Sequence, residues 1–138
     1  MQLNSLKKRM KDGDSVIGSW ITLAHPSIAE IMALSGFDWL VIDLEHSVIT
    51  IREAEELIRI IDLAGVTPLV RLTSNNPDQI KRVMDAGAHG VIVPMVMSAD
   101  EAKSAVSSVK YPLAGKRGIG LARAQGYGAN FDQYFEWQ

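Results

Sequence analysis

Apolar positions along the chain follow two different periods. Short runs of consecutive apolar residues alternate with longer segments in which apolar residues recur every three or four positions. The runs are typical of buried parallel strands, and the spaced segments are typical of amphipathic helices packed on a sheet. The pattern predicts strands over Val16–Thr22, Trp39–Asp43, Pro68–Leu72 and Val91–Met95.

Helix boundary signals lie between these strands. Thr50 with Glu53, and Ser98 with Glu101, have the spacing of a capping box, and Asn76 before Pro77 is a further start signal. His25-Pro26-Ser27 opens another helix, and a first helix covers residues 3–11. Glycines at 13, 36, 65 and 87 follow the ends of the first four helices.

Four strands alternating with helices predict an α/β fold with a parallel sheet and right-handed crossovers. Glycines precede the strands, whereas polar residues follow them. The carboxyl ends of parallel strands are where ligands and catalytic groups gather. The side chains expected at this end of the sheet are those of Trp20, Thr22, Asp43, Glu45, His46 and Arg71.

The pattern changes after Lys110. Residues 111–130 hold one proline and five glycines and predict neither helix nor strand, whereas Phe131, Tyr134 and Phe135 resume helical spacing. A fifth strand is expected where the sequence stops. We therefore interpret residues 1–138 as one domain that forms the first half of a longer protein.

Composition narrows the function. The chain has 138 residues, of which 47% are hydrophobic and 22% charged, as expected for a globular domain with a core. A net charge of −2 gives no general attraction to nucleic acid or anionic lipid. No apolar run is long enough for a signal peptide or a membrane span, so the expected location is the cytoplasm. The absence of cysteine excludes disulfides, thiolate metal sites and a cysteine nucleophile.

Three residues are the main candidates for chemistry. His46 follows a strand together with Asp43 and Glu45, so it could act as a general base or simply be a hydrogen-bonded histidine at a corner. Arg71 ends an apolar strand, where it could bind a carboxylate or an oxyanion, or form an ion pair with Asp43 or Glu45. Asp85 lies late in a helix, where a carboxylate is mildly unfavourable, and a solvated surface position is the simpler interpretation.

Other charged residues give weaker signals. Residues 115–120 contain Gly-Lys-Arg-Gly but match neither a Walker loop nor a dinucleotide fingerprint, so we expect a mobile basic loop. Lys116, Arg117 and Arg123 could there meet an anionic substrate. His25 and His89 are expected to be structural. None of the lysines falls at a strand's carboxyl tip, so imine chemistry has no candidate, and a metal is the more natural electrophile for a carbonyl compound.

Taken together, these segments resemble the HpcH/HpaI aldolase family. The resemblance rests on GSW (18–20), AEI (29–31), GFDWLVIDLEH (36–46), PLVR (68–71), IKRVMDAG (80–87), VPMV (93–96), YP (111–112), GKRG (115–118) and LARA (121–124). It runs in order through nearly the whole chain. It implies a TIM-type (β/α)8 barrel, of which only the first four βα units are present here.

The resemblance also implies an activity. Such enzymes are class II aldolases, which depend on a divalent metal (Mg²⁺, Mn²⁺ or Co²⁺) and cleave 4-hydroxy-2-oxo acids to pyruvate and an aldehyde. His46 would be the base with Asp85 as its partner, and Arg71 would bind the carboxylate and oxygen of the pyruvyl group. Trp20 would line the pocket, and Arg123 would meet the far end of a longer substrate. Asp43 and Glu45 would support the site from behind.

Several expectations follow for the assembly. The metal-binding Glu and Asp of the family come from strands five and six, beyond residue 138, so the chain alone should neither hold the metal nor turn over substrate. The partners implied are a small 2-oxo acid and other copies of the protein in a homo-oligomer, with no nucleic acid and no membrane. Three alternatives stay open, namely a small doubly wound α/β binding module, a half-barrel without catalysis, and a related lyase acting on a citrate-like acid or a CoA ester.

Overall fold

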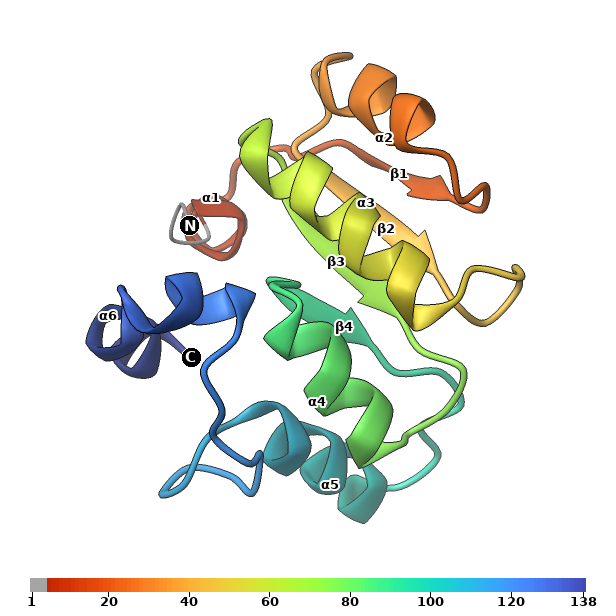
Figure 1. Cartoon of the computed structure of the whole chain (residues 1–138). Coiled ribbons are helices and arrows are strands. Elements are labelled where there is room, and N and C mark those ends of the chain that lie inside the picture. The colour runs from red at the N-terminus through yellow and green to blue at the C-terminus, as the bar shows by residue number, and fades with distance from the viewer. Residues whose placement is uncertain (1–4) are drawn as a thin grey trace.

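The computed structural model describes residues 5–138 and contains one parallel sheet whose strands alternate with helices (Figure 1). The elements are α1 (Ser5–Asp12), β1 (Gly18–Ile21), α2 (Pro26–Ala33), β2 (Trp39–Asp43), α3 (Ile51–Leu63), β3 (Thr67–Arg71), α4 (Pro77–Asp85), β4 (Gly90–Ile92), α5 (Ala99–Val109), the 3₁₀ segment η1 (Arg123–Gly128) and α6 (Phe131–Trp137). The predicted α/β fold with parallel strands is confirmed.

The strand order is β1-β2-β3-β4, and every neighbouring pair is parallel. Asp43 pairs with Arg71, and Arg71 pairs with Ile92, so β2, β3 and β4 end at the same level. The fourth strand is shorter than predicted. It stops at Ile92 because Pro94 has no N–H for the ladder and Met95 adopts a positive φ of 52°.

The helix boundaries follow the local signals. Both predicted capping boxes are present, and the Asn76 side chain caps α4. The sequence did not indicate that the His25 imidazole itself caps α2, where Nδ1 accepts a hydrogen bond from the Ser27 N–H at 3.2 Å. Gly36, Gly65 and Gly87 have φ values of 88°, 83° and 104°, the left-handed conformation that reverses the chain after a helix.

The main core lies between the sheet and the helices on one of its faces. In Figure 1, α3 and α4 lie in front of the strands that they cover. Burial of aliphatic side chains at this interface is the main favourable contribution to folding. The largest side chains that are fully buried there are those of Ile21, Leu40, Ile42, Leu57, Ile58, Ile61, Leu72, Ile80 and Met84.

The other face of the sheet carries Trp20, Asp43 and Arg71, because β-strand side chains alternate between faces and these positions are in register. Gly18 pairs with Trp39 on the same face. The Trp39 ring occupies the space in which a Cβ at position 18 would lie. Position 18 therefore has room only for glycine while the indole keeps this position.

The segment after α5 forms a second, smaller cluster. Tyr111, Ala124 and Tyr134 are buried together, and the Arg117 guanidinium lies 4.1 Å from the Tyr111 ring centroid and 5.5 Å from that of Tyr134. The predicted helix at Phe131 is confirmed as α6. The expectation that Arg117 meets an anionic substrate is wrong, because its guanidinium is buried between aromatic rings.

Within residues 5–138, no helix combines the length and the apolar character that crossing a bilayer requires.

Candidate functional site

The carboxyl ends of β2 and β3 bring a carboxylate and a guanidinium group into direct contact. Asp43 is the last residue of β2, and its register partner Arg71 is the last residue of β3. Arg71 donates from Nε to Asp43 Oδ1 at 2.9 Å and from Nη2 to Oδ2 at 2.6 Å. This two-pronged contact fixes the plane of the guanidinium relative to the sheet.

Asp43 also organises the turn that follows its strand. Its Oδ1 accepts the backbone N–H groups of Glu45 at 3.0 Å and His46 at 3.2 Å, an arrangement of the kind found in Asx turns. Only 3% of the Asp43 side chain is exposed. The hydrogen bonds from Arg71 hold the pKa of Asp43 below its usual value, although burial opposes this. The ion pair in turn raises the pKa of Arg71. Both groups are therefore charged at neutral pH.

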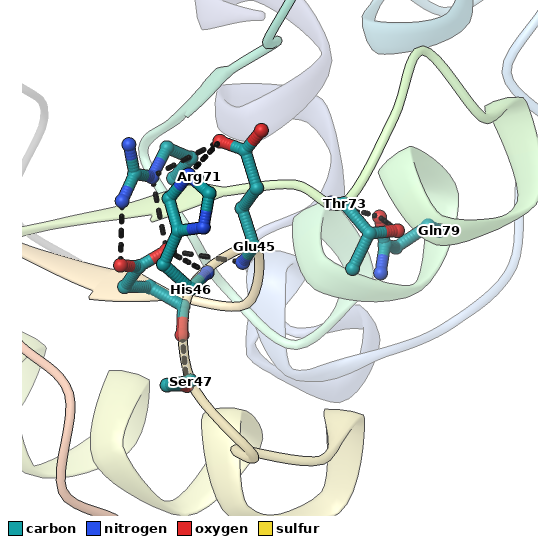
Figure 2. A network of polar contacts seen from close by, with 7 residues as sticks. Glu45, His46, Ser47, Arg71, Thr73 and Gln79 are labelled. Carbon is teal, nitrogen blue, oxygen red and sulfur yellow. Dashed lines mark hydrogen bonds and ion pairs between the residues drawn. The ribbon is translucent and has the colours of Figure 1, made fainter.

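Glu45 and His46 lie beside Arg71 (Figure 2). Glu45 Oε2 is 3.4 Å from Arg71 Nε and 3.7 Å from His46 Nε2. The His46 side chain is 70% exposed, whereas that of Glu45 is 21% exposed. The imidazole is thus accessible from solvent while its backbone N–H is fixed by Asp43.

Trp20 from β1 completes the cluster. The Arg71 Cζ atom lies 4.5 Å from the centroid of the Trp20 ring, within cation–π range. The indole covers one face of the guanidinium, and Asp43 covers the Nε edge. Within residues 5–138, Nη1 makes no hydrogen bond. Arg71 consequently has N–H groups left for an anionic oxygen.

Three polar residues that the sequence did not indicate shape the adjoining loops. The Ser47 hydroxyl donates to the Asp43 carbonyl and accepts the Ile49 N–H at 3.1 Å. Gln79 Oε1 accepts from the Thr73 N–H at 3.0 Å and from the Thr73 hydroxyl at 3.1 Å (Figure 2). A serine four residues after a strand-ending aspartate is the local signal that could have indicated Ser47.

Asp85 does not join this cluster. It ends α4, just before β4 begins at Gly90, and so lies toward the amino end of the sheet. Burial raises the pKa of the Asp85 carboxyl, and the positive charges of Arg117 and Lys81 partly oppose that shift. Its Oδ1 is buried without a hydrogen-bond partner among the residues described. The catalytic partnership with His46 is not formed within one chain and stays a prediction.

Arg123 also lies elsewhere. It donates to Asp62 Oδ2 at 2.6 Å, and the two side chains are 12% and 8% exposed. The His89 side chain, 4% exposed, places Nε2 at 3.1 Å from Asp62 Oδ1, as expected for a structural histidine. Burial alone would raise the pKa of Asp62, but the close contact with His89 and the hydrogen bond from Arg123 outweigh it and lower that pKa. The role of Arg123 at the far end of a substrate therefore stays a prediction that this conformation does not support.

The described residues do not fit a divalent-metal site. Within residues 5–138, no group of three or more histidine or acidic side chains is arranged so that it could hold a metal ion. Asp43 and Glu45 are the acidic groups beside His46, and both face the cationic Arg71. Their negative charge is therefore partly matched before any metal could approach.

Comparison with known proteins gives a consistent set of matches. Residues 16–131 match the profile of the HpcH/HpaI aldolase/citrate lyase family. A 4-hydroxy-2-oxovalerate aldolase from Novosphingobium aromaticivorans is 41% identical over 127 residues, which are 91% of this chain and 48% of that protein. A 4-hydroxy-2-oxo-heptane-1,7-dioate aldolase from Salmonella dublin is 42% identical over 88% of this chain and 46% of its own length.

A solved structure agrees with these sequence matches. The crystal structure of an HpcH/HpaI aldolase/citrate lyase family protein from Burkholderia cenocepacia J2315 superposes with a TM-score of 0.88 and 35% identity. The match covers 96% of this chain and 55% of that protein. The chain therefore spans about half the length of the relatives that it matches.

Proposed function

Because this chain belongs to the HpcH/HpaI aldolase/citrate lyase family, we propose that it forms the amino-terminal half of a (β/α)8-barrel aldolase. The reaction is cleavage of a 4-hydroxy-2-oxo acid to pyruvate and an aldehyde. One observation carries the proposal. His46 and Arg71 project side by side from the carboxyl ends of two neighbouring parallel strands, where active sites of such barrels are built.

Arg71 binds the pyruvyl end of the substrate in this proposal. Its free N–H groups suit a carboxylate or the neighbouring 2-oxo oxygen, and Trp20 restricts the approach to one face. Cleavage of the C3–C4 bond leaves an electron pair on the pyruvate fragment as an enolate. A fixed cation stabilises that developing charge more than it stabilises the neutral ketone, so Arg71 lowers the barrier.

His46 accepts the proton that the reaction releases. As the C3–C4 bond breaks, the 4-hydroxyl becomes the aldehyde oxygen and gives its proton to the imidazole. The exposed position of His46 lets a substrate reach it. The hydrogen bond from its backbone N–H to Asp43 limits where the ring can move. The proton later returns to the enolate carbon to give pyruvate.

We also propose that the complete enzyme needs a divalent metal such as Mg²⁺, Mn²⁺ or Co²⁺. This rests on the family, since the described residues do not fit such a site. When bound, such a metal supplies Lewis-acid stabilisation of carbonyl and enolate oxygens. Its predicted Glu and Asp ligands lie beyond residue 138, and the roles of His46 and Arg71 above do not depend on where it binds.

The test is a chimera in which this chain replaces the matching half of the N. aromaticivorans aldolase. Pyruvate release from 4-hydroxy-2-oxo acids is followed by coupling to lactate dehydrogenase, with added Mg²⁺, Mn²⁺ or Co²⁺ and after chelation. We expect pyruvate to form and chelation to abolish it. A chimera that is folded by circular dichroism but releases no pyruvate would contradict the proposal, and activity that survives exhaustive chelation would remove the metal.

The same assay separates the nearest alternative. The family description includes citrate lyases, so citrate is offered beside the 4-hydroxy-2-oxo acids. Cleavage of citrate in preference to the oxo acids would favour the alternative. The predicted homo-oligomer and cytoplasmic location stay predictions, and light scattering on the purified chimera tests the first of them.

A further inference from the structure

We propose that Glu45 is the positioning residue of His46, and that it couples binding of the oxo acid at Arg71 to orientation of the imidazole. The inference rests on the proposed function. It concerns Glu45 because this side chain contacts both proposed functional groups. The observation that carries it is that one carboxylate oxygen of Glu45, Oε2, contacts both Arg71 and His46 (Figure 2).

The cluster around Arg71 carries more negative than positive charge. Arg71 contributes one positive charge, and Asp43 matches it through two hydrogen bonds. Glu45 then adds a negative charge for which the cluster has no further cation. When His46 takes a proton it becomes cationic, and Glu45 is the nearest ionic group to that new charge. Glu45 can therefore stabilise the imidazolium as it forms.

The carboxylates of Asp43 and Glu45 are held differently. Asp43 accepts four hydrogen bonds, two from Arg71 and two from backbone N–H groups. Within the described residues, the Glu45 carboxylate makes none, and its two ionic contacts are long at 3.4 and 3.7 Å. Asp43 is consequently fixed, whereas Glu45 is free to shift between its two neighbours.

Binding of the substrate changes the contacts of Glu45. A substrate carboxylate at Arg71 brings a negative charge close to Glu45 and competes for the same guanidinium. Repulsion moves Glu45 away from Arg71, and His46 is the other group within its reach. The contact is with Nε2, so Nδ1 is the nitrogen that remains for the proton of the 4-hydroxyl. The proton moves only between the substrate and His46.

Nuclear magnetic resonance on the chimera, with pyruvate alone added, tests this without turnover of the oxo acid. Pyruvate is the probe, the Trp20 indole N–H reports binding at Arg71, and the ring protons of His46 report the coupled movement. His25 and His89 serve as internal references. We expect pyruvate to shift the signals of both Trp20 and His46 in the wild-type chain. In Glu45→Gln, the Trp20 shift should persist and the His46 shift should be lost.

The control is Glu55→Gln, which removes an exposed carboxylate from α3 and should respond as the wild type does. A His46 response that is unchanged in Glu45→Gln would overturn the inference, as would a wild-type chain in which Trp20 responds and His46 does not. Absence of any response at Trp20 would instead contradict the assignment of Arg71, and the inference would fall with it.

Kinetics of the chimera give a second readout. Glu45→Gln should lower kcat about 10-fold or more and leave KM for the oxo acid within about threefold, because positioning acts on the chemical step. In a His46→Ala background the same substitution should have no further effect, since residues that act as a unit are not additive. Multiplicative losses in the double variant would overturn the coupling.

Discussion

Two carboxylate–arginine pairs lie toward opposite ends of the sheet, and each has a histidine beside it. At the carboxyl end, Asp43 holds Arg71 while His46 is 70% exposed. At the other end, Asp62 holds Arg123 while His89 is 4% exposed. The same three residue types are therefore an accessible site in one place and a closed structural contact in the other. Access to solvent, more than residue identity, separates the two clusters.

The largest expected effect comes from breaking the closed cluster, which consists of Asp62, Arg123 and His89. Asp62→Ala should lower the free energy of unfolding by about 3–5 kcal/mol, because it leaves Arg123 and His89 buried without their carboxylate. Urea unfolding followed by circular dichroism measures this. Glu55→Gln is the matched control, since its partner Arg59 is 46% exposed and such surface pairs contribute about 0–1 kcal/mol. Equal losses in both variants would refute the distinction between the clusters.

The open cluster consists of Asp43, Arg71 and His46. Removing its arginine should affect the rate of the reaction more than the stability of the fold. Arg71→Met leaves Asp43 with its two backbone donors, so the loss of stability should be smaller than for Asp62→Ala. In the chimera, kcat should fall about 10²–10³-fold, the usual consequence of losing a donor to a developing oxyanion. Arg59→Met on the surface of α3 is the control. A variant that retains the wild-type rate would exclude Arg71 from the mechanism.

Acid should weaken both clusters by a smaller amount than deletion, because a protonated carboxyl group still accepts hydrogen bonds. The folded-state pKa values of Asp43 and Asp62 are lowered relative to the ordinary value of 3.8. Their contributions to stability are therefore complete above that value and are lost as the pH falls through the lower folded-state values. Unfolding curves between neutral and strongly acid pH measure this. In Asp43→Asn and in Asp62→Asn, the free energy of unfolding should decrease less as the pH falls. An unchanged dependence on pH would contradict the prediction.

The smallest expected change in stability is that of His46→Ala. An exposed imidazole contributes little to folding, so the free energy of unfolding should stay within about 0.5 kcal/mol of the wild type. The same variant should lose about 10²–10⁴-fold in kcat in the chimera. Chemical unfolding and the pyruvate assay on one preparation give both numbers. A stable variant with full activity would show that His46 is not the general base.

Local signals predicted much of the fold. The capping boxes at Thr50 and Ser98 are satisfied within four residues, so sequence spacing alone identifies them. The adjacency of His46 and Arg71 was also predictable, because consecutive βα units place neighbouring strands in register. The structural alternative for Arg71, an ion pair with Asp43 and Glu45, is confirmed and coexists with its proposed role.

The arginines of the tail could not be placed from the sequence. Arg123 reaches Asp62 across 61 positions, and Arg117 enters a cage of aromatic rings. A glycine-rich basic segment looks mobile by composition, yet long side chains can bury their charge wherever a distant partner matches it. No spacing rule encodes such a partner. The same limit applies to Asp85, whose surroundings depend on how the tail packs.

The contact between Gly18 and the Trp39 ring has a consequence for related sequences. Any side chain at position 18 would displace the indole, whereas a smaller residue at position 39 would open room for one. Positions 18 and 39 should therefore co-vary, with glycine accompanying a large aromatic and a bulkier residue accompanying a small one. Substituting both residues together should preserve the distance between β1 and β2, whereas substituting either residue alone should change it.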